Sequence, residues 1–293
     1  ADWPDLLTAY NGKSITYDAI GNPLSDGTWT YAWQHGRQLA SMSKNGSSIA
    51  YGYNADGKRI SKTVNGTTYN YSYLGDQLTE MTWGSNKLHF TYDSIGPASV
   101  TYNGNRYFYL KNAQGDVTGL VNASGTQVVS YTYDPWGAPM STDGTMAATL
   151  GAANPLRYRG YVYDTETGLY YLTSRYYNPV WGRLINADTA DVVATFPDKT
   201  HWDKNLFAYC DDNPVNRRDD GGDLWEYAVG KMIVGTVVGG LTGGISSMLD
   251  DAAAGKEVSL ASFAKGFFPG MLSGAVSTAA SLVMEGLVPL ISI

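Results

Sequence analysis

A short motif that returns at nearly even intervals is the feature that most constrains how this chain can fold. The motif is Tyr, then Asp or Asn, two variable residues and Gly, and its full copies begin 36, 39 and 41 residues apart. An Asp or Asn side chain opens a turn by bonding nearby backbone amides, and Gly closes it in the left-handed conformation. We therefore predict that a strand ends at each of these tyrosines and that a second strand returns after each glycine. The full copies are Tyr17-Asp18 with Gly21, Tyr53-Asn54 with Gly57, Tyr92-Asp93 with Gly96, and Tyr133-Asp134 with Gly137.

Further turn dipeptides lie within and between these copies. Asn-Gly begins at 11, 45, 65 and 103, and Asp-Gly begins at 26, 56 and 143. Both accept the positive φ angles that a type I′ hairpin turn requires. The intervening runs alternate, as in 67–73, where every second position from Tyr69 onward is tyrosine, and this period indicates strands with one buried face. A single hairpin cannot bury such a face, so we predict a mainly β strip of stacked hairpins over residues 1–150.

Composition excludes several functional classes. The net charge is −7 and only 16% of residues are charged, which argues against a nucleic-acid partner because phosphate binding needs clustered Lys and Arg. We expect no cofactor and no metal site, since there is one cysteine, predicted to be a buried thiol, and the three histidines are scattered. Calcium binding by the turn side chains is an alternative, but bonds to the backbone of the turn are the favoured role. The side chains concerned are Asp18, Asn54, Asp93, Asp134 and Asp164.

The composition changes near residue 222, after which Gly, Ala, Val and Ser dominate. Two stretches of this tail, 232–249 and 266–284, carry no charged residue, and small residues every fourth position form a face for close helix packing. We predict a glycine-faced helical region over 223–293, packed as a helical hairpin. Insertion into a membrane is the alternative, because 18 or 19 uncharged residues come close to spanning a bilayer. The predicted packing glycines are Gly235, Gly239, Gly243, Gly266, Gly270 and Gly274.

Three segments after residue 155 carry a family resemblance. They are RYRGYVYDTETGLYYL at 157–172, SRYYNPVWGRLINAD at 174–188 and NLFAYCDDNPVN at 205–216. Together with the Tyr-Asp copies they resemble the YD repeats and the Rhs-associated core of Rhs polymorphic toxins, in a Firmicutes-like style, and of the related teneurins. The resemblance implies that the repeats wind into a hollow shell, that the core over 151–222 closes it, and that a C-terminal toxin is held inside. It also implies that the helical region over 223–293 is a linker or pre-toxin segment between core and toxin.

The resemblance also implies a candidate catalytic site. Several members are aspartyl autoproteases, in which two carboxylates share a proton so that one activates water while the other donates to the carbonyl oxygen. The motifs map these roles to Asp188 and Asp219, with Arg183 as a structural or polarising residue, and place cleavage near Leu224. Thr189 and Asp220 depart from the family pattern, which has proline at both positions. The alternative is that both aspartates are turn residues bonded to the backbone.

These features together predict the closing segment of a secreted or cell-surface toxin shell, whose enzymatic activity is at most aspartyl self-cleavage. Its expected partners are upstream YD repeats of the same polypeptide, a C-terminal toxin cargo and the immunity protein of that toxin, and a cell-surface or membrane target is left open. The chain begins without methionine or a leader, so we expect a fragment of a longer protein. Two alternatives remain: a surface adhesin or carbohydrate-binding repeat module, and a membrane-active effector acting through the tail.

Overall fold

The computed structural model describes residues 3–93, 96–188, 205–219 and 246–247. The chain divides into two compact units, Ala1–Asp223 and Leu224–Ile293. Nearly all described residues belong to the first unit. The helical tail and its six predicted packing glycines lie outside the described residues.

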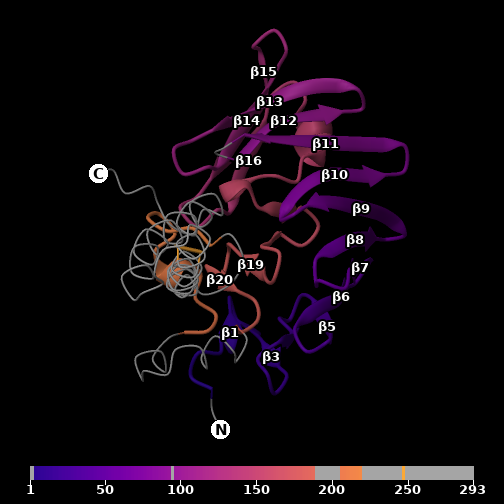
Figure 1. Ribbon diagram of the computed structural model, residues 1–293. Helices are drawn as coiled ribbons and strands as arrows, with labels where there is room; N and C mark the ends of the chain where they lie inside the picture. Colours follow the sequence, from indigo (N-terminus) through magenta and orange to yellow (C-terminus); the bar gives the residue numbers. More distant parts are fainter. Residues whose placement is uncertain (1–2, 94–95, 189–204, 220–245, 248–293) are drawn as a thin grey trace. The chain divides into compact units, whose positions relative to one another are not determined.

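Short antiparallel strands dominate the first unit (Figure 1). The repeat region contains β1 (Ala9–Tyr10), β2 (Lys13–Ser14), β3 (Thr16–Tyr17), β4 (Pro23–Ser25), β5 (Thr30–Gln34), β6 (Gln38–Lys44), β7 (Ser47–Tyr53), β8 (Arg59–Val64), β9 (Thr67–Leu74), β10 (Gln77–Trp83), β11 (Asn86–Asp93), β12 (Gly96–Tyr102), β13 (Asn105–Lys111), β14 (Val117–Asn122), β15 (Gln127–Tyr133) and β16 (Pro139–Asp143). The rest contains a π-helical turn, η1 (Ala147–Gly151), two 3₁₀ turns, η2 (Tyr158–Gly160) and η4 (Cys210–Asp212), and strands β17 (Val162–Asp164), β18 (Leu169–Tyr171), β19 (Tyr176–Asn178) and β20 (Arg183–Leu184).

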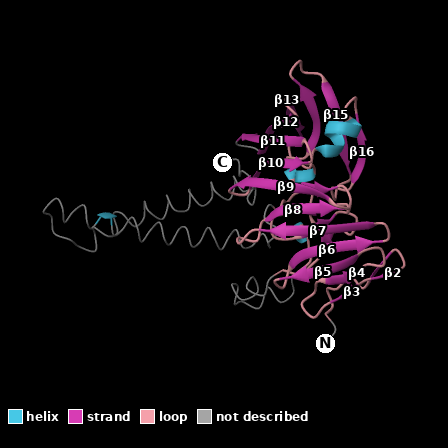
Figure 2. Cartoon of the chain, turned by 90° about the vertical axis from the view of Figure 1, so that its right-hand side faces the viewer, coloured by secondary structure: helices cyan, strands magenta, loops and turns pink. Residues whose placement is uncertain are grey.

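The repeat strands form one open strip. Within the described residues, β3 to β16 make a 14-stranded sheet whose order follows the chain, and every neighbouring pair is antiparallel. Figure 2 shows strands β5 to β11 lying one beside the next along this strip. The terminal strands β3 and β16 do not pair with each other, so the sheet is not closed. The predicted mainly β strip of stacked hairpins is confirmed.

The two classes of turn lie at opposite edges of the strip. In an antiparallel meander the loops after odd-numbered strands share one edge, and every Tyr-Asp/Asn turn in this sheet follows an odd-numbered strand. Two-residue turns at 65–66 and 103–104 lie at the other edge, and both residues of each have positive φ, as a type I′ turn requires. The Asp-Gly prediction of a type I′ turn was wrong at all three places. Asp26-Gly27 lies in a four-residue loop between β4 and β5, and Asp26 does not have a positive φ. Asp56-Gly57 belongs to a longer motif turn, and no strand returns from Asp143-Gly144, because η1 follows β16.

The motif turn is held by its first polar side chain. Asn54 Oδ1 accepts the backbone N–H groups of Asp56 and Lys58 at 3.1 and 2.9 Å, and Gly57 has a φ of 80°. Asp18, Asn112, Asn122 and Asp134 repeat the same pair of bonds. The predicted backbone role is therefore confirmed for these side chains. In each of these residues one side-chain oxygen accepts two backbone N–H groups of its own turn.

The tyrosine of the repeat motif has a second role in three of the hairpins. The hydroxyls of Tyr53, Tyr92 and Tyr133 donate to the carbonyl oxygens of Leu39, Leu78 and Val117 at 2.8–2.9 Å. Each acceptor residue lies in the preceding strand next to a shift in register, where a bulge interrupts the regular ladder. Each hairpin is thus bonded by a side chain to the one before it. Trp33 does the same in a hairpin without the tyrosine, donating from Nε1 to Pro23 O at 2.7 Å.

One face of the strip is apolar and is covered by the segment that follows it. Leu39, Leu88, Val100 and Leu120 come from β6, β11, β12 and β14 and are fully buried in a single hydrophobic cluster. The same cluster includes buried residues from 150–185. The core segment therefore packs against the buried face of the wall, by which we mean the sheet β3–β16. The core's own strands form a second sheet in the order β17-β18-β19-β20.

Candidate functional site

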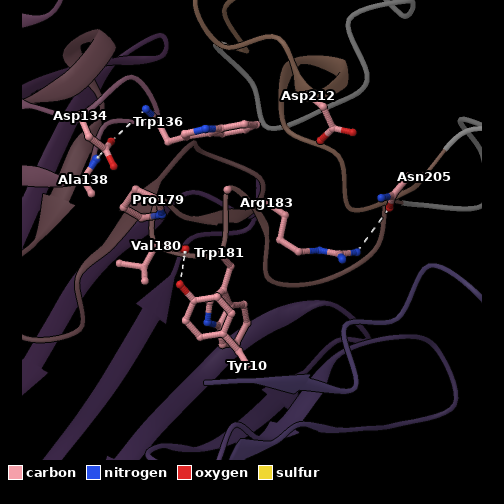
Figure 3. Close-up of a pocket in the computed structure, with 11 residues that line it drawn as sticks. Tyr10, Asp134, Trp136, Ala138, Pro179, Val180, Trp181, Arg183, Asn205 and Asp212 are labelled. Carbon is pink, nitrogen blue, oxygen red and sulfur yellow. Dashed lines mark hydrogen bonds between the residues drawn. The ribbon is translucent and has the colours of Figure 1, made fainter. Parts of the chain in front are cut away.

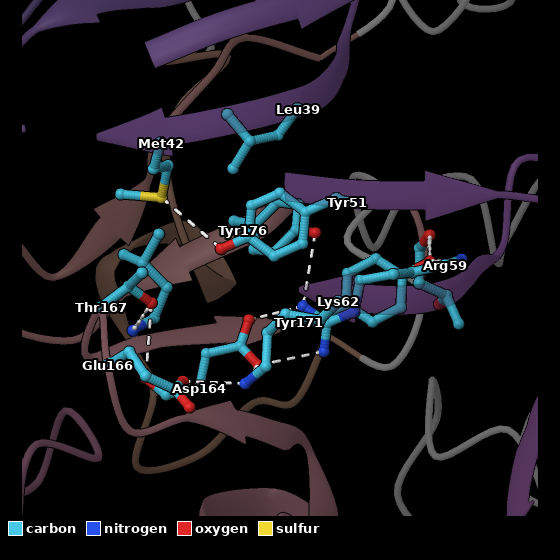
Figure 4. Close-up of polar contacts among 12 residues, drawn as sticks. Leu39, Met42, Tyr51, Arg59, Lys62, Asp164, Glu166, Thr167, Tyr171 and Tyr176 are labelled. Atoms are coloured by element: carbon cyan, nitrogen blue, oxygen red, sulfur yellow. Dashed lines mark hydrogen bonds and ion pairs between the residues drawn. The ribbon is translucent and has the colours of Figure 1, made fainter. Parts of the chain in front are cut away.

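A buried ion cluster joins the wall to the core. Arg59, the first residue of β8, is fully buried and donates to Asp164 through both terminal nitrogens, at 2.5 and 3.1 Å. Lys62, three residues along the same strand, donates to Asp164 at 2.9 Å and to Glu166 at 2.8 Å. Figure 4 shows the two cations of the wall facing the two carboxylates of the core. The first Tyr-Asp pair of the core therefore uses its aspartate in an interdomain contact. The predicted turn-bonding role for the Asp164 side chain was wrong.

Aromatic rings enclose the Arg59 guanidinium. Its carbon lies 4.5 to 5.6 Å from the ring centroids of two wall tyrosines and two core tyrosines, a range suited to cation–π attraction. The Arg59 backbone N–H also donates to the Tyr171 hydroxyl at 2.9 Å. The guanidinium is thus fixed from both sides of the interface. The four rings are those of Tyr51, Tyr71, Tyr171 and Tyr176.

The electrostatics of this cluster favour charged partners. Burial alone would raise the pKa of Asp164, but the neighbouring Arg59 and Lys62 outweigh burial and hold that pKa below its usual value. Burial would lower the pKa of Lys62, and Asp164 keeps it above its usual value instead. The cluster therefore keeps its charges near neutral pH. We interpret it as an anchor that positions the core, because its cations and carboxylates pair with one another across the interface.

A tyrosine cluster ties the core to the last motif turn. The hydroxyls of Tyr170 and Tyr177 donate to the carbonyls of Gly137 and Trp136 at 2.8 and 2.7 Å. The rings of Tyr177 and Tyr209 stack at 3.9 Å, which extends the cluster to the last described segment. Gly137 has a positive φ, and any Cβ there would overlap a core tyrosine ring. This turn requires glycine for its backbone and also for the close approach of the core.

The first predicted catalytic aspartate lies in a buried ion pair. Asp188 is 1% exposed, and its Oδ2 accepts from Arg175 at 2.7 Å. Its backbone N–H donates to Leu206 O at 3.1 Å, which brings residues 205–208 beside it. A second arginine, Arg37 of the wall, donates to the carbonyl of Ala187 at 2.7 Å. Asp188 thus lies where the wall and two parts of the core meet.

The second predicted aspartate, Asp219, is also buried, at 4% exposed. Its backbone N–H donates to the Tyr161 hydroxyl at 3.1 Å. Burial raises the pKa of the Cys210 thiol, and the charge of Asp219 adds to that rise. Cys210 is therefore an unreactive buried thiol, as predicted. The described contacts of Asp188 and Asp219 are with different neighbours, and their joint action as a protease pair stays a prediction. Leu224 lies outside the described residues.

Arg183 is one of the residues that line a pocket. The Arg183 Nη2 donates to Asp5 O at 2.5 Å and to Asn205 Oδ1 at 3.4 Å. The Arg183 guanidinium carbon lies 4.8 Å from the centroid of the Phe207 ring. Burial lowers the pKa of Arg183. The pocket has a volume of about 440 Å³, and Figure 3 shows Arg183 reaching toward Asn205 beside it. The sequence did not predict this pocket, because its lining residues come from four separate segments.

Comparison with known families accounts for this arrangement of wall and core. The profile described as the teneurin YD-shell matches residues 2–215, which is most of the chain and nearly all of its described part. The chain belongs to the teneurin YD-shell family. The resemblance stated from the repeats and the core segments is thereby confirmed. Bacterial toxins of the WapA and Rhs type are among its relatives, and the likeness is to their shell segment.

Two named relatives illustrate the range of the family. The tRNA nuclease WapA of Bacillus subtilis is 40% identical over 228 residues, covering 75% of this chain and 10% of that protein. The probable deoxyribonuclease RhsA of Dickeya dadantii is 29% identical over 197 residues, covering 62% of this chain and 13% of that protein. This YD-shell chain therefore spans about a tenth of the length of such relatives.

Solved structures support the same fold. The crystal structure of TcdB2-TccC3-Cdc42 superimposes with a TM-score of 0.57 at 20% identity, covering 71% of this chain and 11% of that one. The Photorhabdus luminescens Tc holotoxin pore gives a TM-score of 0.56 at 21% identity, covering 70% and 10%. At this identity the likeness concerns the fold alone. Among the described residues, no helix is long and apolar enough to cross a bilayer.

The ion cluster predicts how stability depends on pH. Because the folded-state pKa of Asp164 lies below the unfolded value of about 3.9, its contribution is complete above that value and is lost as the pH falls through the folded pKa. We expect Asp164→Asn to lower the free energy of unfolding at pH 7 by about 3 kcal/mol or more, since it leaves Arg59 buried without a counter-charge. The loss should shrink as the pH falls below 4, which urea unfolding at several pH values measures.

A surface pair supplies the matched control. Lys58 and Asp76 lie 2.6 Å apart, but the Asp76 side chain is 76% exposed. Asp76→Asn should change the free energy of unfolding by at most about 1 kcal/mol. Equal effects of the two substitutions at pH 7 would contradict the anchor role of Asp164.

Proposed function

We propose that this chain is the closing segment of an Rhs-type toxin shell that encloses and delivers a C-terminal toxin. The observation that carries the proposal is that the core covers the buried face of the wall and is anchored there by Arg59 and Asp164. A core held on the inner side of a curved repeat wall is suited to closing a container. An adhesin of the same repeat type would need no such buried ionic anchor.

The partners follow from the geometry of the strip. Strand β3 is the first strand of the described sheet and pairs as a strand only with β4, and the Leu7 carbonyl of the preceding segment accepts from its Tyr17 hydroxyl at 3.1 Å. We assign this edge of the sheet to upstream YD repeats of the same polypeptide, which would extend the wall.

The cargo would continue from the tail beyond residue 223, and an immunity protein would protect the producing cell from it. Relatives named as a tRNA nuclease and a double-stranded DNA deaminase toxin favour a cargo that acts on nucleic acid. Such a shell would act after secretion or at the cell surface.

Protection of the cargo tests the enclosing role. In the complete polypeptide, with its upstream repeats and C-terminal segment, we expect the cargo to resist trypsin for at least ten times longer than the same cargo expressed alone. Mass spectrometry of timed digests measures the two rates. A cargo that is cut equally fast in both preparations would refute enclosure.

Self-cleavage after the core is the enzymatic part of the proposal. One carboxylate of Asp188 and Asp219 would take a proton from water, and the other would donate a proton to the carbonyl oxygen of the bond near Leu224. Water then adds across the peptide bond, which leaves a new carboxylate and a new amine. Burial of both aspartates supports the proposal, since a low-dielectric setting favours sharing of one proton.

Intact mass measurements test the cleavage. On prolonged incubation we expect a fragment that ends near Leu224, and we expect both Asp188→Asn and Asp219→Asn to abolish it. Asp212 is exposed and lies in the same segment as Asp219, so Asp212→Asn is the matched control and should still be cut. An unchanged intact mass for the unaltered chain, or cleavage that survives Asp219→Asn, would reject the dyad.

A further inference from the structure

Asn-Gly pairs occur at four turns in the described part of the chain, and the structures of these turns differ. The pairs begin at Asn11, Asn45, Asn65 and Asn103. In three of them the asparagine has a φ of 47° or 48°, so that both turn residues are left-handed, as a type I′ turn requires. Asn45 does not have a positive φ, whereas Gly46 has a φ of 76°, a sign pattern typical of a type II turn. The prediction of a type I′ turn was therefore wrong at 45–46.

Hydrogen bonds to the neighbouring strand fix the side chains at two of these turns. Asn65 Oδ1 accepts from the Ser48 backbone N–H at 2.8 Å, and Asn103 Oδ1 accepts from the Lys87 backbone N–H at 2.9 Å. Asn103 Nδ2 also donates to Asn86 Oδ1 at 2.9 Å. Rotation of either carboxamide toward the glycine that follows it would break these bonds, and each broken bond costs free energy.

The Asn45 side chain is not held in this way. It is exposed and makes no hydrogen bond within the described residues. A Cβ placed on Gly46 would meet no atom within 4 Å, so the space around this glycine is open. Glycine also lacks the Cβ that would hinder approach to its own backbone nitrogen. The Asn45 carboxamide can therefore rotate toward the Gly46 nitrogen without losing a contact.

We propose that Asn45 is a site of spontaneous deamidation, at which water converts the side-chain amide to a carboxylate. The Gly46 backbone nitrogen attacks Cγ of Asn45, and the new N–Cγ bond replaces the Cγ–Nδ2 bond. The proton lost from the Gly46 nitrogen passes through solvent to the departing ammonia, and a cyclic imide remains. Water then adds across either carbon–nitrogen bond of the imide ring, which gives aspartate or isoaspartate. No group is oxidised or reduced.

Either product changes the edge of the wall. Both add a negative charge at the turn between β6 and β7. Isoaspartate also routes the main chain through the side-chain carbon, which lengthens the link between the two strands. Lys44 and Ser47 oppose each other directly across this two-residue turn, so a longer link disturbs their pairing. The wall thus changes in charge and local pairing as it ages, whether or not it encloses a toxin or cleaves itself.

Peptide mapping of the full chain after ageing in heavy-oxygen water tests the proposal. Mildly alkaline pH favours loss of the amide proton, and the labelled oxygen marks only carboxylates that form during ageing. We expect Asn45 to convert about tenfold faster than Asn65 or Asn103, a ratio equal to roughly 1.4 kcal/mol in activation free energy. Asn11 has the left-handed backbone but no side-chain hydrogen bond within the described residues, so we expect an intermediate rate there.

Two variants and an unfolded sample provide controls. Asn45→Gln should remove the fast site, because the longer side chain closes the ring less readily, and should leave conversion at Asn65 unchanged. Asn86→Ala removes the acceptor of the Asn103 amide and should speed conversion at Asn103 about threefold. In guanidinium chloride the four sites should convert at similar rates, because their ranking depends on the fold.

Three results would overturn the proposal. The first is an aged chain without labelled carboxylate at Asn45. The second is conversion of another Asn-Gly pair as fast as that of Asn45 in the folded chain. The third is a lead of Asn45 that persists in guanidinium chloride, because the difference would then come from the local sequence and not from the structure.

Discussion

A long sheet with one apolar face needs a cover, and a charge buried within that cover needs a partner. Here the segment after residue 150 supplies the cover, and it brings the fully buried carboxylate of Asp164 with it. Two cations of β8, Arg59 and Lys62, are the only described groups that form ion pairs with that carboxylate. Apolar burial drives the core onto the wall with little directional preference. The ionic contact selects one placement, because shifting the core would leave charges buried and unpaired.

The wall itself is built by contacts between neighbours. The motif turns at Asp18, Asn54 and Asp134 close through their own side chains. The hydroxyls of Tyr53, Tyr92 and Tyr133 bond to a bulge in the strand before. No contact within this scheme reaches further than the adjacent hairpin, so the number of repeats is free to vary without redesigning the turns. The core departs from the scheme: Asp164 turns away from its own loop and bonds across 105 residues to Arg59. That departure marks where the repeat ends and closure begins.

The sequence predicted the repeat architecture well because turn chemistry is local. It predicted the strand ends, the left-handed glycines and the buried face from spacing alone. The sequence analysis missed the anchor, although a signal was present. Arg59 is the cross-strand neighbour of the motif tyrosine Tyr53. In the other three copies of the motif this position is a proline, namely Pro23, Pro97 and Pro139. A charged residue at that repeat position had no local explanation. The longer spacing from Asp164 to Gly168 was likewise interpreted as a variant of the repeat turn. The ion pair between Arg59 and Asp164 joins residues 105 positions apart, and a contact so distant in the chain leaves no periodic pattern in the sequence. The site near Arg183 was missed for the same reason.

The central claim is that the wall and the core open together as one cooperative unit. Native-state hydrogen exchange of the intact chain measures this most directly, with the amides of β8 and β18 as reporters on the two sides of the anchor. The account predicts equal opening free energies for the two strands, and an equal decrease in both when Arg59 is replaced by Met. The account would be contradicted if β18 opened at a much lower free energy than β8, or if Arg59→Met left the protection of β18 unchanged.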